Sequence, residues 1–94
     1  MKVSVNFFSI FREKMKRRKV DVEVPENITI EELLSLLSSK FGSRFSDLIY
    51  GSQIQSLSNI KFTINGRAIS NLQGLQTRLK NSDEIAIIPP AGGG

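Results

Sequence analysis

Near its end the chain reads Glu84-Ile85-Ala86-Ile87-Ile88-Pro89-Pro90-Ala91-Gly92-Gly93-Gly94. Residues 84–88 are almost evenly apolar, and such a run is typical of a central strand that is buried on both faces. Proline has no backbone N–H, so the Pro89-Pro90 pair ends the strand. The glycines that follow carry no side chain to pack and have the widest backbone freedom. The pattern predicts either a central strand that bears a thin flexible tail, or a strand followed by an idle, frayed end.

The composition narrows the chemistry that is open to the chain. Its 94 residues suit one domain. It contains no cysteine and no histidine, which excludes disulfides, thiolate nucleophiles, the usual zinc sites and catalysis by Ser-His or Cys-His pairs. Any reactive group must then be a carboxylate, an amine or a chain terminus. No apolar run approaches the roughly 20 residues that span a bilayer, and the N-terminus lacks the layout of a signal peptide, so we expect a cytoplasmic protein.

The formal net charge of +4 is concentrated in residues 12–19, which hold six basic residues and one acid. The remainder of the chain is close to neutral. We interpret the segment as one basic loop that is either simply solvated or steers an acidic partner, an anionic lipid or RNA. It has no interleaved aromatic residues on which bases could stack, so nucleic-acid binding is the less favoured alternative.

Two stretches near the start alternate between apolar and polar residues, as half-buried strands do. In residues 3–8 the alternation directs Phe8 to the face opposite the other apolar side chains, and in residues 19–24 the valines point inward. We expect these strands to form an antiparallel hairpin, with a short helical turn at residues 10–15 before the basic segment.

One helix has both its start and its end marked in the sequence. Thr29 and Glu32 have the spacing of a capping box, apolar residues then recur at helical spacing as far as Phe41, and Gly42 is a natural C-terminal cap. The pattern predicts an amphipathic helix over residues 30–41 whose apolar stripe packs on the sheet.

The middle of the chain is less regular. Residues 45–50 could build a short second helix, and the turn-rich residues 51–59 have no predicted role. Residues 60–64 alternate again as a strand. Asn65-Gly66 favours positive φ at both central positions of a tight turn, so residues 67–69 are expected to return as a short strand.

One helix across a mixed sheet of four to five strands is an α+β fold of the ubiquitin-like, β-grasp kind. In such a fold the last strand lies in the centre of the sheet beside the first. We therefore expect a β-grasp domain at residues 1–88 and a flexible Gly-Gly tail at residues 89–94.

Several pieces, which together span essentially the whole chain, carry a family resemblance: Phe7-Phe8 with the following Arg12-Glu13, the helix at residues 30–41, Phe62-Thr63-Ile64-Asn65-Gly66, and residues 83–90 before Gly93-Gly94. The chain resembles the sulfur-carrier small subunit of molybdopterin synthase, a β-grasp relative of ubiquitin and of the thiamine-pathway sulfur carrier. The last piece is the most specific. The chain departs from the commoner tail at Ala91-Gly92, where the pattern often has a bulkier pair.

The resemblance implies that an ATP-dependent adenylyltransferase, similar to ubiquitin-activating enzymes, adenylates the carboxylate of Gly94. Sulfur then replaces the AMP to give a thiocarboxylate. Gly92 and Gly93 would pass through narrow channels in which a Cβ clashes, and Pro89-Pro90 limits the entropy that is lost on insertion.

The loaded tail would next enter the large catalytic subunit of a heterotetrameric molybdopterin synthase. There it would donate sulfur to a cyclic pyranopterin precursor in the synthesis of molybdenum or tungsten cofactor. The chain would be a carrier that borrows its partners' active sites, and we expect it to bind no metal or other cofactor itself.

A partner surface is predicted beside the tail. Phe8 and Ile88 fall on the sheet face opposite the helix, and with Pro89 and Pro90 they could form an exposed apolar patch for the large subunit and the activating enzyme. The alternative is that a local loop covers them. Arg67, just after the tight turn, could also contact the partner.

Two other functions use the same tail and remain open. The chain could be a protein modifier that is joined through Gly94 to lysines of other proteins. It could also carry sulfur for thiamine synthesis or tRNA thiolation.

Overall fold

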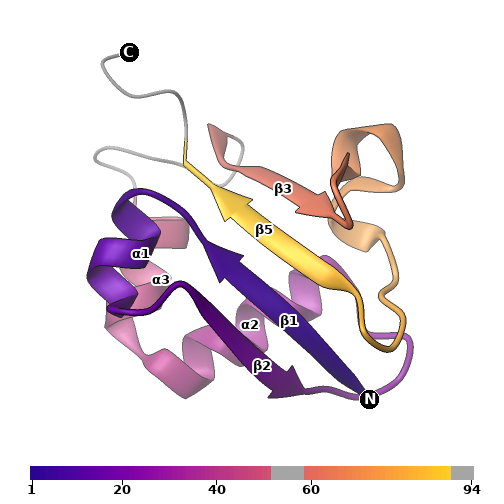
Figure 1. The fold of residues 1–94 in the computed structure, drawn as a ribbon, viewed down its shortest axis with the longest axis horizontal. Helices are drawn as coiled ribbons and strands as arrows, with labels where there is room; N and C mark the ends of the chain where they lie inside the picture. Colours follow the sequence, from indigo (N-terminus) through magenta and orange to yellow (C-terminus); the bar gives the residue numbers. More distant parts are fainter. Residues whose placement is uncertain (52–58, 90–94) are drawn as a thin grey trace.

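A computed structural model describes residues 1–51 and 59–89. Within this part of the chain, five strands form one sheet: β1 (Lys2–Phe7), β2 (Lys19–Glu23), β3 (Lys61–Ile64), β4 (Arg67–Ala68) and β5 (Glu84–Ile88). Their order across the sheet is β2-β1-β5-β3-β4 (Figure 1). β5 runs parallel to β1, and the other neighbouring pairs are antiparallel. The predicted β-grasp fold is confirmed, with the last strand in the centre of a mixed sheet beside the first.

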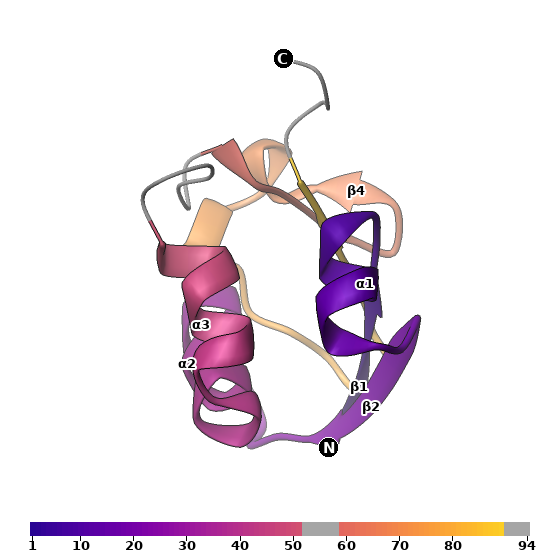
Figure 2. The ribbon, with the colours of Figure 1, turned by 90° about the vertical axis from the view of Figure 1, so that its left-hand side faces the viewer.

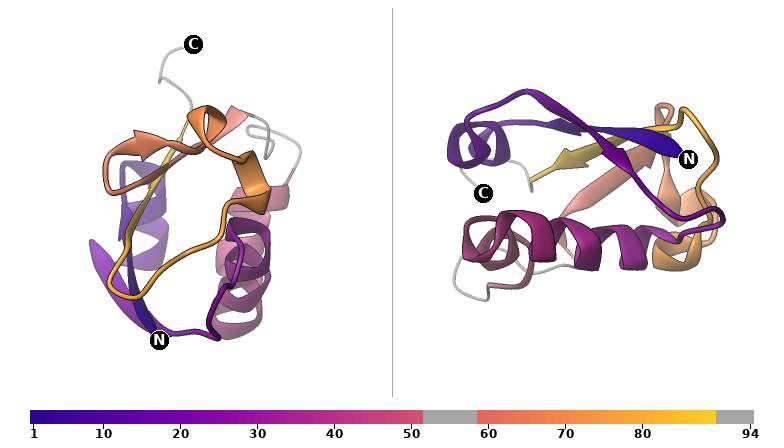
Figure 3. Two further views of the ribbon diagram at one scale, coloured as in Figure 1. Left: turned by 90° about the vertical axis from the view of Figure 1, so that its right-hand side faces the viewer. Right: turned by 90° about the horizontal axis from the view of Figure 1, so that it is seen from below.

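The helices of this region are α1 (Ile10–Met15), α2 (Ile30–Phe41) and α3 (Ser43–Tyr50), and two short 3-10 turns, η2 (Ile69–Asn71) and η3 (Gly74–Gln76), lie between β4 and β5. The predicted bounds of α1 and α2 are confirmed, and α3 begins two residues before its predicted start. α2 and α3 lie on one side of the sheet, as the view from below shows (Figure 3, right). None of the described helices is long and apolar enough to cross a membrane.

The start of α2 is fixed by the predicted capping box. The Glu32 N–H donates to the Thr29 hydroxyl at 3.1 Å, and the Thr29 N–H donates to the Glu32 carboxylate at 2.9 Å. Both donors are otherwise orphan groups of a helix N-terminus, so the pair sets where the helix begins. At the other end, Gly42 closes α2 and opens α3: its N–H donates to Ser38 O at 2.8 Å and its carbonyl accepts from Phe45 N–H at 3.0 Å. The φ of Gly42, +72°, favours glycine at this junction.

The core lies between the inner face of the sheet and the helices. The inner face is made of alternate strand residues, all buried: Val3, Val5, Phe7, Val20, Val22, Phe62, Ile64, Ile85 and Ile87. The ring of Phe45, on α3, meets that of Phe7 edge to face with 6.4 Å between centroids. This contact joins α3 to the end of β1.

The hairpin predicted at Asn65-Gly66 is confirmed. The two residues have φ of +51° and +85°, and the flanking strands pair Ile64 with Arg67 and Thr63 with Ala68. Positive φ at both central positions is the geometry of a two-residue turn that matches the strand twist.

Two predictions are corrected. β5 is central, but it is not buried on both faces: Ile85 and Ile87 are buried, whereas Ala86 and Ile88 are half-buried. The reason is that α2 and α3 lie on the inner side, and none of the described helices covers the outer face of the sheet (Figures 2 and 3).

The basic segment at residues 12–19 is also not one loop. Arg12 and Lys14 lie on α1, residues 16–18 form the turn, and Lys19 opens β2. Two of the basic side chains, Arg12 and Lys14, are therefore attached to a helix, which fixes the directions in which they leave the backbone.

Candidate functional site

The end of β5 is held rigidly at the centre of the sheet. Ile87 pairs with Phe7 of β1 on one side and with Phe62 of β3 on the other. Ile88, the last residue of the strand, pairs with Lys61. Because β1 and β5 are parallel, Phe8 comes directly after β1 at the same end of the sheet. Pro89 therefore follows a strand that is paired on both sides.

The outer face of the sheet is hollowed at this place. A depression of about 530 Å³, which we name the outer-face hollow, crosses β1, β5 and β3. Phe8 and Ile88 both line it, together with Ala86 and Thr63. Phe8 is 42% exposed, so within the described residues no loop covers it. The structure thus brings together two residues of the predicted apolar patch, and Pro89 beside them is half-buried.

The other end of the outer-face hollow is polar and locked by hydrogen bonds. The Asn65 side chain donates to the Asp83 carboxylate at 2.9 Å and accepts from the Glu84 N–H at 2.9 Å. The second carboxylate oxygen of Asp83 accepts from Lys80 N–H at 2.7 Å. These bonds tie the β3–β4 turn to the start of β5, and so fix the register of the strand that carries the tail.

The turn that follows Phe8 is strained. Ser9 has φ 50° and ψ −124°, and the Phe11 N–H donates to Phe8 O at 3.0 Å. The first central residue of a type II′ turn has this conformation and is usually glycine. A side chain there costs about 1–3 kcal/mol. The strained residue adjoins Phe8, one of the apolar side chains of the outer-face hollow.

The remaining predicted site residues lie elsewhere. Arg67 is exposed on the edge strand β4, where it pairs with the inward-facing Ile64, and it does not line the outer-face hollow. Its contact with a partner stays a prediction. Pro90, Gly92, Gly93 and Gly94 lie outside the described residues.

In chemical terms, the described part of the site can offer a binding surface. No group of three or more His, Cys, Asp or Glu side chains within residues 1–51 and 59–89 is placed to hold a metal ion. What the geometry offers is an apolar depression beside Pro89, where the predicted tail begins, with polar side chains joined by hydrogen bonds at its far end.

Sequence reasoning missed Ala86, Thr63 and the Asn65–Asp83 bond. The first two could have been found from strand alternation, because residues two apart share a face and Ala86 precedes Ile88 by two. The bond joins residues 18 positions apart, and no local pattern predicts such a pairing.

The ThiS family profile matches residues 5–94 of this chain. The molybdopterin synthase sulfur carrier subunit of Drosophila melanogaster is 39% identical over 93 residues, which cover 98% of this chain and 90% of that protein. Small archaeal modifier protein 3 of Haloferax volcanii is 27% identical over 94 residues, the full length of both chains. The crystal structure of SAMP1 from Haloferax volcanii matches with a TM-score of 0.83 at 23% identity, again over both full lengths, which shows a shared fold.

Proposed function

This chain belongs to the ThiS family, and from that premise we propose that it is the sulfur-carrier small subunit of a molybdopterin synthase. In this proposal the carboxylate of Gly94 attacks ATP on a partner adenylyltransferase, which releases pyrophosphate and leaves an acyl adenylate. A donor of sulfide-level sulfur then attacks the acyl carbon and displaces AMP to give a thiocarboxylate. The large catalytic subunit receives the loaded tail, and sulfur passes to a pyranopterin precursor in the cytoplasm.

The observation that carries the proposal is the outer-face hollow at the end of the central strand. Phe8 and Ile88 line a depression directly beside the residue at which the proposed tail, residues 89–94, leaves the domain of residues 1–88. A partner that covers the hollow would bury apolar surface, and each Å² buried would contribute about 25 cal/mol to the free energy of binding. The same partner would hold the start of the proposed tail at a fixed distance from its own active site. Similarity to the Drosophila melanogaster carrier subunit over 98% of this chain supports the same assignment.

In this proposal the activating enzyme, the docking surface and the tail have separate roles, and each role has a chemical reason. A carboxylate is a poor acyl donor until one of its oxygens becomes a good leaving group, which adenylation provides. The docking surface is rigid because it lies on paired strands, so little entropy is lost when it binds. In the tail, glycines admit close contact with a channel wall.

A second candidate is a protein modifier, in which the activated Gly94 is joined to lysines of target proteins. The full-length similarity to small archaeal modifier protein 3 favours it. Sulfur carriage for thiamine synthesis or tRNA thiolation is a variant of the first proposal, because it uses the same thiocarboxylate and differs in the acceptor.

Intact-mass and tandem mass spectrometry of the protein from its native cell separates these functions. A carrier gives a species in which one oxygen of Gly94 is replaced by sulfur. Fragmentation must place the added mass on Gly94, because oxidation of Met1 or Met15 adds nearly the same mass. A modifier gives a branched peptide between Gly94 and a lysine. If cells whose protein lacks Gly93-Gly94 make cofactor and conjugates normally, both proposals are wrong.

A further inference from the structure

A second depression lies between α1 and α3, away from the outer-face hollow. It has a volume of about 610 Å³, and we name it the α1–α3 cleft. Figure 2 shows α1 and α3 opposite each other, at the end of the sheet that faces the viewer. The residues that matter for its chemistry come from both helices and from the turn after α1: Glu13, Lys14, Lys16, Arg44, Asp47 and Leu48.

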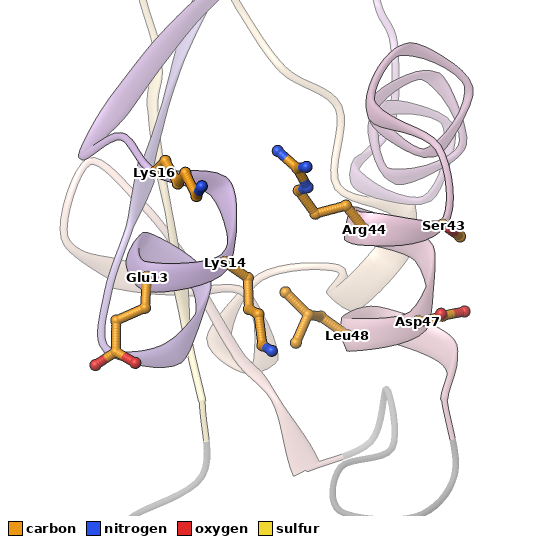
Figure 4. A pocket seen from close by; sticks show the side chains of 7 residues that line it. All are labelled: Glu13, Lys14, Lys16, Ser43, Arg44, Asp47 and Leu48. Atoms are coloured by element: carbon orange, nitrogen blue, oxygen red, sulfur yellow. The ribbon is translucent and has the colours of Figure 1, made fainter.

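In the α1–α3 cleft, the basic and acidic side chains point in different directions. Figure 4 shows Lys14 and Arg44 turned into the space between the helices, with Lys16 at its edge on the α1 side. The side chain of Leu48 also points into the space, from one helical turn beyond Arg44. The carboxylates of Glu13 and Asp47 point away from it to the outer sides. The cleft therefore presents cations around an apolar side chain and has acids on its rims.

Further cations continue this surface toward the end of α2. The guanidinium carbon of Arg17 lies 5.4 Å from the centroid of the Phe41 ring, and the Lys40 ammonium lies 6.0 Å from it. Cations at these distances are held over an aromatic ring. The fold thus gathers Lys40 and Arg44 with the basic residues of the 12–19 segment, although they are more than 20 positions apart in the sequence.

We propose that the α1–α3 cleft binds an acidic segment of a partner protein, in which carboxylates flank an apolar side chain. Lys14, Lys16 and Arg44 supply the opposite charges, and Leu48 supplies a contact for the apolar side chain. A continuous phosphate backbone fits less well, because it is charged along its whole length and would extend past the cations to Glu13 and Asp47 on the rims. The lining also contains no aromatic side chain on which a base could stack.

The cleft lies where a partner that binds the tail could contact it at the same time. α1 follows β1, and β1 and β5 end at the same side of the sheet, so a partner that receives the tail can reach the cleft with a neighbouring segment. Attraction between opposite charges steers encounter and fixes orientation before apolar surfaces meet. The inference does not depend on the chemistry at Gly94.

The test is an NMR titration of the full, nitrogen-labelled chain with a short peptide in which glutamates flank one leucine. Amide shifts are expected in α1 and α3, and the matched peptide with glutamine for each glutamate should bind about tenfold more weakly. The double variant Lys16→Gln and Arg44→Gln should lose a similar factor. Its control, Lys2→Gln with Lys80→Gln, removes the same charge at the opposite end of β1, where Ser82 N–H donates to Lys2 O, and should bind as the parent does.

Three results would overturn the proposal. Absence of binding by the glutamate peptide would do so, as would an equal loss in the control variant, which indicates attraction to net charge alone. Tighter binding of an RNA duplex at the same amides would assign the cleft to nucleic acid instead. A chain that lacks Gly93-Gly94 is expected to bind the peptide unchanged, so the outcome is separate from that of the proposed function.

Discussion

Ile87 and Ile88 are adjacent and chemically identical, yet the sheet gives them opposite surroundings. Ile87 is 0% exposed on the inner face, against the helices, and Ile88 is half-buried on the outer face beside Phe8. The inner face holds the core, whose side chains are packed on every side. The outer face leaves apolar surface uncovered at the end of β5. If the outer face binds the proposed partners, core stability and partner binding reside on opposite faces of one strand and can be changed separately.

The largest expected effect comes from the inner face. Ile87→Ala removes a fully buried side chain and leaves a cavity, so we expect the free energy of unfolding to fall by about 2–5 kcal/mol. Chemical denaturation followed by circular dichroism measures it. Ile88→Ala is the matched variant, and the same experiment should show a loss of at most about 1 kcal/mol, because the side chain is already partly solvated. Equal losses would mean that the two faces are not divided in this way.

On the outer face we expect substitutions to weaken partner binding more than they lower stability. Ile88→Ala and Phe8→Ala should each weaken binding to the adenylyltransferase and to the large synthase subunit by about tenfold or more, because each removes apolar area from the proposed contact. Calorimetric titration of both partners checks this. Leu36→Ala, on a half-buried position of α2, is the control and should bind normally. Unchanged binding of both outer-face variants would remove the outer-face hollow from the interface.

The polar end of the outer-face hollow is an exception to this division, because its hydrogen bonds also hold the start of β5 in place. Asn65→Asp replaces the donor to Asp83 by a second carboxylate, so the free energy of unfolding should fall by about 1–2 kcal/mol. The double variant Asn65→Asp with Asp83→Asn restores a donor and an acceptor, and should recover most of the loss. Thermal unfolding of both proteins measures the effect. Failure of the double variant to recover would show that the hydrogen bond is not the cause.

The smallest expected effect is a gain at the turn beside Phe8. Ser9→Gly relieves a positive φ at a residue that carries a side chain, and we expect the protein to become more stable by about 0.5–1 kcal/mol after the entropy cost of glycine. A shift of the denaturation midpoint at constant slope measures it. Ser70→Gly, at an exposed position, should instead be neutral or destabilising, and a gain there of the same size would contradict the explanation.

Local patterns predicted most of the fold. Alternation placed Phe8 on the outer face, the Thr29–Glu32 pair gave the start of α2, and Asn65-Gly66 gave the tight turn, because each depends on residues within a few positions. The predicted burial of β5 on both faces was wrong, because an apolar sequence does not tell whether a helix or a partner protein covers a face.

The candidate sites were less predictable than the fold. Bringing Arg44 into one cleft with Lys14 depends on how α3 packs against α1, and strand and helix patterns contain no information on that packing. The outer-face hollow was half predicted, through Phe8 and Ile88, because both belong to strand ends whose faces alternate.

The central place of β5 also bears on how the protein is made. β1 has its two sheet neighbours in β2, which follows it closely, and in β5, which begins at Glu84. Until β5 has been synthesised, β1 and β3 have no strand between them, so the sheet cannot close before residues 84–88 have left the ribosome. Pairings between such distant residues slow folding, because loop closure must precede them. Folding therefore completes only after β5 has emerged, and a chain cut short before Glu84 would lack the middle of its sheet and be open to proteolysis.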